Sequence, residues 1–176
     1  MSGSMVRGRK ASTEAAAVID GLLGVSRVLV GLTARSLGEL DADVTLVQTR
    51  ALVLLASRGP QRTVDLAVEL NVAPSTVTRM CDRLVRKGLV ERYRRGDDRR
   101  ATWVVLSEAG RDLVGELMRQ RRRAIADLVR SLPIEDPAGL AAALDSFVQA
   151  AGEIPEAQWT RRWRASAVRP ADAIPA

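Results

Sequence analysis

Two apolar stripes run from Thr13 to about Leu40 of the chain, and the first of them alternates spacings of four and three residues. One stripe consists of Val18, Leu22, Val25, Leu29 and Leu32, and the other of Ile19, Leu23, Val30 and Leu37. Such intervals place side chains on one face of a helix. The pattern therefore predicts a long helix that needs cover on two sides.

Shorter helical patterns follow, and glycine, proline and asparagine separate them. Thr45 stands three residues before a glutamine, which is the spacing of a capping box, and the helix that it starts ends at Gly59. Thr63 is the predicted cap of a short helix, and Pro74 begins a longer one that Gly88 closes. Helices of about eight and fourteen residues, joined by a turn of three or four, have the dimensions of a helix-turn-helix.

Strand-like segments come next, at Leu89–Tyr93 and Ala101–Leu106, with Arg95–Asp98 as the turn between them. They predict a β-hairpin, or wing, directly after the helix pair. Serine and aspartate caps then predict two further helices, at about 107–131 and 136–152.

The predicted fold is mainly α-helical with one small β-hairpin wing. It consists of a flexible arm at 1–10, an N-terminal helix at 11–44, a winged helix-turn-helix domain at 45–106, C-terminal helices at 107–152 and a tail at 153–176. The tail is basic, mixes prolines with Trp159 and Trp163, and is expected to be partly ordered at best.

Composition narrows the function. The chain is 47% hydrophobic but only 3% aromatic, which favours packed helices, and its net charge of +6 favours polyanionic partners. With no histidine and a single cysteine, Cys81, it lacks the usual general base and metal ligands. We therefore expect no enzyme, metal site or cofactor.

No run of eighteen apolar residues and no signal-peptide pattern occurs, so a cytoplasmic protein without membrane association is expected.

The second helix of the predicted pair separates an apolar face from a polar one. Its apolar stripe consists of Val77, Cys81 and Leu84, and its N-terminal polar face of Ser75, Thr76, Thr78 and Arg79. Such polar side chains suit base edges and phosphates in a major groove, and Arg79 is the candidate for guanine. The alternatives are helix capping for the first two hydroxyls and a solvated charge for Arg79.

The predicted tip of the wing carries Arg99 and Arg100 beside two aspartates. A carboxylate can hold an arginine extended for insertion into a narrow minor groove. Salt bridging within the turn is the alternative.

Over residues 45–110 the chain resembles the MarR-type multiple antibiotic resistance regulators. The matching residues are Thr45-x-x-Gln48, Leu66-Ala67, Pro74-Ser75-Thr76-Val77-Thr78-Arg79, Asp82-Arg83-Leu84, Lys87-Gly88-Leu89-Val90, Arg92, Asp98-Arg99-Arg100-Ala101, Leu106-Ser107 and Gly110. Each piece alone is a weak signal, whereas their order and spacing together are specific.

The resemblance implies a homodimer whose terminal helices interlock, with one winged domain on each half-site of double-stranded DNA and half-site centres roughly 34 Å apart. It implies that Ser75, Thr76, Thr78 and Arg79 face the major groove, that Asp98 positions Arg99 in the minor groove, and that Arg83 and Arg86 contact phosphates. Family members often bind small phenolic or lipophilic anions between the dimer helices and the DNA-binding lobe, but the sequence assigns no effector-binding residue here.

The main hypothesis is a repressor that binds a pseudo-palindromic operator as a homodimer and is released by a small-molecule effector. The alternatives are a DNA-architectural protein without an effector, a redox-sensing regulator acting through Cys81, and a protein-interaction scaffold. Cys81 lies on the inward stripe, which favours a buried structural thiol. For the tail, an extended dimer interface, contact with flanking DNA and no role at all stay open.

Overall fold

The computed structural model describes residues 2–40, 43–95, 101–165 and 173–175. It divides the chain into two compact units, Met1–Ala42 and Asp43–Ala176. The wing turn with Asp98, Arg99 and Arg100 lies outside the described residues.

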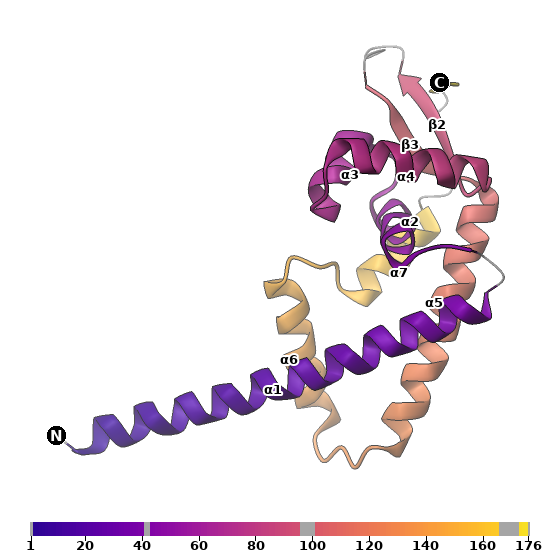
Figure 1. Ribbon diagram of the computed structural model, residues 1–176. Coiled ribbons are helices and arrows are strands. Elements are labelled where there is room, and N and C mark those ends of the chain that lie inside the picture. The colour runs from indigo at the N-terminus through magenta and orange to yellow at the C-terminus, as the bar shows by residue number, and fades with distance from the viewer. Residues whose placement is uncertain (1, 41–42, 96–100, 166–172, 176) are drawn as a thin grey trace. The chain divides into compact units, whose positions relative to one another are not determined.

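The first unit is one long helix, α1 (Ser2–Glu39; Figure 1). It begins at Ser2, which corrects the expectation of an arm at 1–10. Gly3 and Gly8 lower the helix propensity of this stretch, but it contains no proline, and its arginines and Lys10 are good helix formers. Among the described residues, Thr13–Glu39 is long and apolar enough to cross a membrane. Helices that pack against other helices in soluble proteins also have such apolar faces.

The second unit begins with α2 (Leu46–Arg58), whose Thr45–Gln48 capping box is confirmed, since both of its hydrogen bonds are present. A two-residue strand, β1 (Gln61–Arg62), leads into α3 (Thr63–Leu70). The predicted cap of α3 is off by one residue: Arg62 is the N-cap, and Thr63 is helical. The Thr63 N–H donates to the Thr102 carbonyl at 3.1 Å, so strand pairing rather than a side-chain cap fixes this start.

Helix α4 (Pro74–Arg86) has Pro74 in its first turn, as the sequence predicts. Gly88, with φ of 68°, donates to the Val85 carbonyl, and Leu89 donates to the Leu84 carbonyl at 3.0 Å. These two bonds form a Schellman motif, whose positive φ suits glycine. The motif turns the chain directly from α4 into the wing.

The wing pairs β2 (Val90–Arg95) with β3 (Trp103–Leu106), and the predicted hairpin is confirmed. Two strands that the sequence did not predict extend the sheet, β1 on β3 and β4 (Ala173–Pro175) on β2, in the antiparallel order β1-β3-β2-β4. Figure 1 shows the hairpin projecting beyond α3 and α4.

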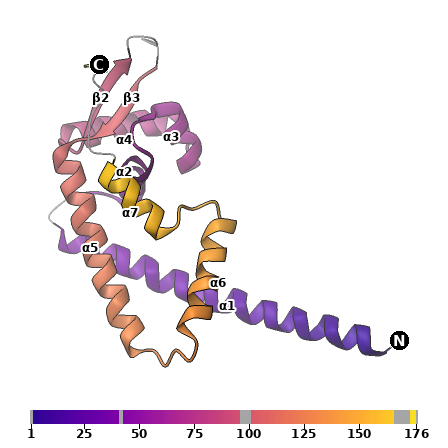
Figure 2. The same cartoon turned by 180° about the vertical axis from the view of Figure 1, so that it is seen from behind.

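Three helices follow the wing: α5 (Glu108–Ser131), α6 (Pro137–Ala150) and α7 (Glu156–Ala165). Ser107 and Asp136 cap the first two, as predicted. Helix α7 lies within the tail at 153–176, and the sequence did not predict it. Its Trp159 and Trp163 pack against the core, and α7 contacts α2 (Figure 2).

The core of the second unit is formed by side chains from α2, α3, α4, β2, β3 and α5. Its largest fully buried members are Tyr93, Leu52, Leu66, Leu84, Val77, Val104, Val114 and Cys81. One close approach completes it, where Gly110 at the start of α5 meets the backbone of Leu89. A Cβ at Gly110 would lie 1.9 Å from the Leu89 carbonyl oxygen.

We predict that Gly110→Ala lowers the free energy of unfolding by at least about 2 kcal/mol, because its methyl group displaces backbone at the junction of α4 and the wing. Gly115→Ala is the matched control on the same helix, since its Cβ meets only side-chain atoms, at 3.4 Å. We expect the control to change stability by no more than about 1 kcal/mol, because alanine also favours helix. Urea denaturation followed by circular dichroism measures both, and equal effects would contradict the prediction.

Candidate nucleic-acid interface

Helix α4 divides cleanly into a buried and an exposed face. Val77, Cys81 and Leu84 are fully buried, as the sequence predicts, and Met80 joins them at 8% exposure. The sequence-predicted contacts on the other face are all exposed: Ser75, Thr76, Thr78, Arg79, Arg83 and Arg86. Burial of the inner face therefore leaves a polar and cationic outer face at the protein surface.

The hydroxyls of the first turn of α4 do not cap the helix. Ala73 is the N-cap, and no side chain makes a capping hydrogen bond there. Among the described residues, Ser75 and Thr76 have no side-chain hydrogen bond, so the capping alternative for these two hydroxyls is wrong. They are available to an outside partner.

Thr78 and Arg79 make bonds only to their own helix. The Thr78 hydroxyl donates to the Pro74 carbonyl at 3.0 Å, and the Arg79 Nε donates to the Ser75 carbonyl at 3.4 Å. No carboxylate among the described residues pairs with Arg79. The terminal nitrogens of its guanidinium can therefore pair with a base edge or a phosphate without first breaking an ion pair.

A link between α4 and the wing was not found by sequence reasoning. Arg92 of β2 donates to Asp82 Oδ1 at 2.6 Å and to the Thr78 carbonyl at 2.9 Å. The Arg92 side chain is only 23% exposed, so these charge-assisted bonds are partly shielded from water. They hold the wing strand against the helix from which the predicted contacts project. Asp82 and Arg92 are both in the matching pattern, but a spacing of ten residues does not predict their pairing.

A hollow of about 390 Å³ lies where the C-terminal end of α4 meets the start of α2. Its lining consists of Asp43, Thr45, Gln48, Arg83, Arg86 and Lys87. Lys87 Nζ pairs with Asp43 at 3.2 Å, whereas Arg83 and Arg86 have no ion pair among the described residues. These two arginines place positive charge at the far end of α4 from Arg79.

Cys81 is buried and free, and burial raises the pKa of its thiol, while the nearby Arg92 guanidinium acts in the opposite direction. A thiol that is fully buried and mostly protonated reacts slowly with oxidants. The geometry supports the structural interpretation over the redox-sensing one.

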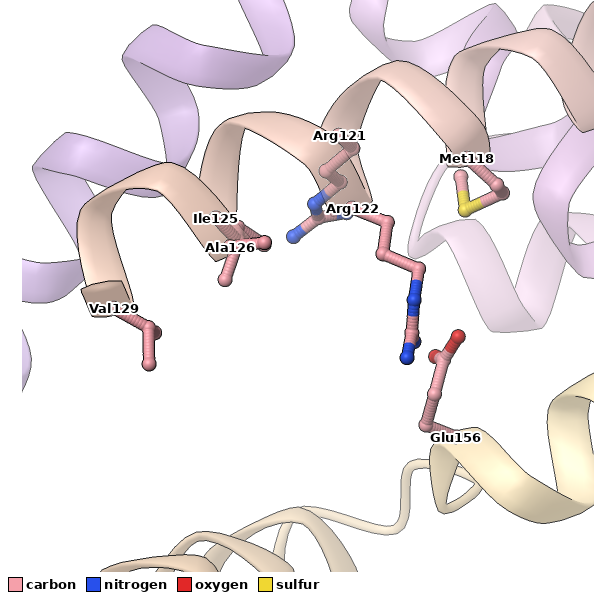
Figure 3. Close-up of a pocket in the computed structure, with 7 residues that line it drawn as sticks. All are labelled: Met118, Arg121, Arg122, Ile125, Ala126, Val129 and Glu156. Carbon is pink, nitrogen blue, oxygen red and sulfur yellow. The ribbon is translucent and has the colours of Figure 1, made fainter. Parts of the chain in front are cut away.

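A second hollow, of about 510 Å³, lies along α5 (Figure 3). Met118, Ile125, Ala126 and Val129 supply apolar lining, Arg121 and Arg122 supply positive charge, and Glu156 comes from α7. In Figure 3 the Arg122 side chain extends toward Glu156. A pocket with apolar walls and two guanidinium groups suits an amphipathic organic anion. Within the described ranges, no group of three His, Cys, Asp or Glu side chains could hold a metal ion.

Comparison with known proteins is consistent with this architecture. The MarR family model matches residues 44–102. YwhA, an HTH-type transcriptional regulator of Bacillus subtilis, is 32% identical over 72 residues, covering 41% of this chain and 52% of YwhA. The chain thus spans about half the length of YwhA, and 58% of YhbI from the same organism.

Other relatives match over more of their length. MdtR, an HTH-type transcriptional repressor of B. subtilis, is 32% identical over 119 residues, covering 68% of this chain and 76% of MdtR. The crystal structure of RV1404 from Mycobacterium tuberculosis is 37% identical, covers 81% of this chain and 97% of RV1404, and superposes with a TM-score of 0.74. The family resemblance found in the sequence is therefore confirmed: the chain belongs to the MarR family.

Proposed function

We propose that the chain is a sequence-specific DNA-binding transcription regulator that inserts α4 into the major groove. The observation that carries this proposal is the exposed outer face of α4, with its free hydroxyls and an arginine that has no ion-pair partner among the described residues. The net charge of +6 adds a general attraction to phosphates. Streptococcus pneumoniae FabT, which has the same fold, has been solved in complex with DNA.

Each predicted contact then has a role. Arg79 pairs with guanine, while Ser75, Thr76 and Thr78 contact bases or phosphates. Arg83 and Arg86, in the last turn of α4, neutralise phosphates of the DNA backbone. Arg99, positioned by Asp98 and flanked by Arg100, enters the adjacent minor groove.

The YwhA, YhbI and MdtR relatives are named transcription regulators, and we propose no enzymatic activity. Regulation of chromosomal DNA also implies a cytoplasmic location.

We predict that Arg79→Ala weakens binding to the operator upstream of the chain's own gene by about 5- to 150-fold, the equivalent of about 1–3 kcal/mol for a bidentate arginine–guanine pair. The control, Arg119→Ala, removes the same charge from α5, where Arg119 pairs with Glu116. We expect Arg119→Ala to weaken DNA binding only slightly, and equally for both DNA sequences, because it removes only a general attraction to phosphates. Mobility shifts at moderate salt, with the operator and a base-substituted operator, measure both. Unchanged affinity and unchanged discrimination in Arg79→Ala would contradict base reading by this residue.

We further propose that the chain acts as a homodimer. The apolar side chains of α1 are exposed, among them Val18, Ile19, Leu23 and Val25. Helix α6 has no buried residue, and its Leu140, Leu144 and Phe147 are 43–51% exposed. Apolar faces of this extent on separate helices are unfavourable in water and suit a second copy of the chain.

The dimer proposal predicts a particle of twice the 19.0 kDa of the chain at micromolar concentration. The double variant Leu144→Glu/Phe147→Glu is expected to shift the equilibrium to monomer, because it buries two carboxylates in the interface. Val68→Glu is the control, since Val68 of α3 is 81% exposed and lies on the winged lobe, which is the part of the chain formed by α2–α5 and the wing strands. Sedimentation velocity measures all three, and a wild-type monomer would contradict the proposal.

The regulator is further proposed to be a repressor that an organic anion releases from DNA. The hollow lined by Arg121 and Arg122 on α5 is the candidate binding site for this anion, because it offers apolar walls and positive charge together. NadR, which has this fold, has been solved in complex with 4-hydroxyphenylacetate. The hollow therefore supports the lipophilic-anion class that the family resemblance implies.

Using 4-hydroxyphenylacetate as the probe, we expect operator dissociation at millimolar concentration for the wild-type chain. Arg121→Gln should weaken this response without changing operator affinity, because it removes one of the two charges that attract the carboxylate. Arg130→Gln is the control on the same helix, outside the hollow and paired with Asp127. Fluorescence anisotropy of labelled operator measures the response. A wild-type chain that stays on DNA would exclude this anion class, and an equal response in Arg121→Gln would exclude this binding site.

A further inference from the structure

The chain after α6 contacts the winged lobe at two separate places. Helix α7 packs on the helical core, and β4 pairs with the wing. The matching residues of the family pattern end at Gly110, so neither contact belongs to that pattern.

The first contact is built from aromatic stacking and charge. The rings of Trp159 and Trp163 stack with centroids 5.6 Å apart and an interplanar angle of 11°. The Arg111 guanidinium of α5 lies 4.6 Å from the centre of the Trp163 ring, and its Nη2 donates to the Trp163 carbonyl at 3.1 Å. Gly115 leaves room for the Trp163 ring, which would lie 3.4 Å from a Cβ at that position. The tryptophan stack lies within α7, whereas the Arg111 contacts and the fit at Gly115 hold Trp163 against α5.

Helix α2 forms the other side of this contact. It packs against α7, and its Arg50 pairs with Glu153, three residues before α7 begins. Helix α7 therefore contacts the two helices, α2 and α5, that pack against the helix pair and the wing. It is independent of the outer face of α4.

The second contact is main-chain pairing on the outer edge of β2. Tyr93, Arg94 and Arg95 of β2 are in register with Pro175, Ile174 and Ala173 of β4. Among the described strands, β3 pairs with the inner edge of β2 and β4 with the outer one. The pairing reaches Arg95, which directly precedes the wing turn that carries Asp98 and Arg99.

We propose that α7 and β4 act together on the winged lobe, α7 as an anchor on the helical core and β4 as a clasp on β2, and that they position the wing for DNA. Without β4, β2 would be the edge strand of the sheet, and an unpaired strand edge exchanges its hydrogen bonds with water. Pairing with β4 restricts the conformations of β2, so less entropy is lost when the wing enters a groove. The effect on DNA affinity rests on the proposed function, whereas the effect on the wing itself does not.

The test of the clasp is a chain that ends at residue 172, which removes β4 and leaves α7 intact. We expect amide hydrogen exchange at Arg94 and Arg95 to become about tenfold faster or more, because local opening of β2 no longer breaks the β4 pairing. Operator affinity should fall by about 3- to 10-fold as the wing loses order. Unchanged exchange would overturn the clasp, and faster exchange with unchanged affinity would overturn its role in DNA binding.

The test of the anchor is Trp163→Ala in the full chain, with Trp163→Phe as the conservative variant and Arg161→Ala, an exposed α7 residue, as the control. We expect Trp163→Ala to raise exchange at Arg94 and Arg95, and Trp163→Phe to restore most of the protection. A lower melting temperature without faster exchange in β2 would show that α7 stabilises the core but does not act on the wing. Exchange needs no DNA, so failure of the proposed function would change only the affinity measurements.

Discussion

The buried face of α4 determines the geometry of the rest of the lobe. Val77, Cys81 and Leu84 are each fully buried against a core that also contains side chains of α2, α3, β3 and α5. Burial of such side chains contributes about 1.5–3 kcal/mol each for the larger apolar ones. Because the three residues lie on one helical stripe, their burial fixes the rotation of α4 about its axis. The same rotation exposes Ser75, Thr76, Thr78 and Arg79 together.

The orientation of the wing follows from α4 through two further constraints. The Schellman motif at Gly88 sets the path from helix to strand, and the Arg92 bonds to Asp82 and the Thr78 carbonyl hold β2 against the helix. Gly110 lets the start of α5 approach the same turn. Helix α4, the wing and α5 thereby meet at one junction. The candidate anion-binding site lies further along α5, which is consistent with regulation through that helix.

Sequence reasoning succeeded where a structure depends on neighbouring residues. The capping box at Thr45, Pro74 at the start of α4, the glycine after it and the caps of α5 and α6 are all local signals. It failed where tertiary contacts decide. Helix α7 is ordered by the fit of Trp163 between Arg111 and Gly115, and β1 and β4 are too short to show a pattern of alternation.

For the candidate site, the outward face of α4 followed from its apolar stripe, but the Asp82–Arg92 pair depends on how β2 lies against α4. The roles of Asp98, Arg99 and Arg100 are still predictions, because these residues lie outside the described part of the chain. Under the proposed function, the two winged lobes of a dimer read a specific operator. Hydroxyl-radical footprinting of the DNA upstream of the chain's own gene tests it most directly. We predict two protected stretches whose centres lie about 34 Å apart, absent from unrelated DNA at the same salt concentration. Equal protection along any duplex would contradict the account and indicate a DNA-architectural protein.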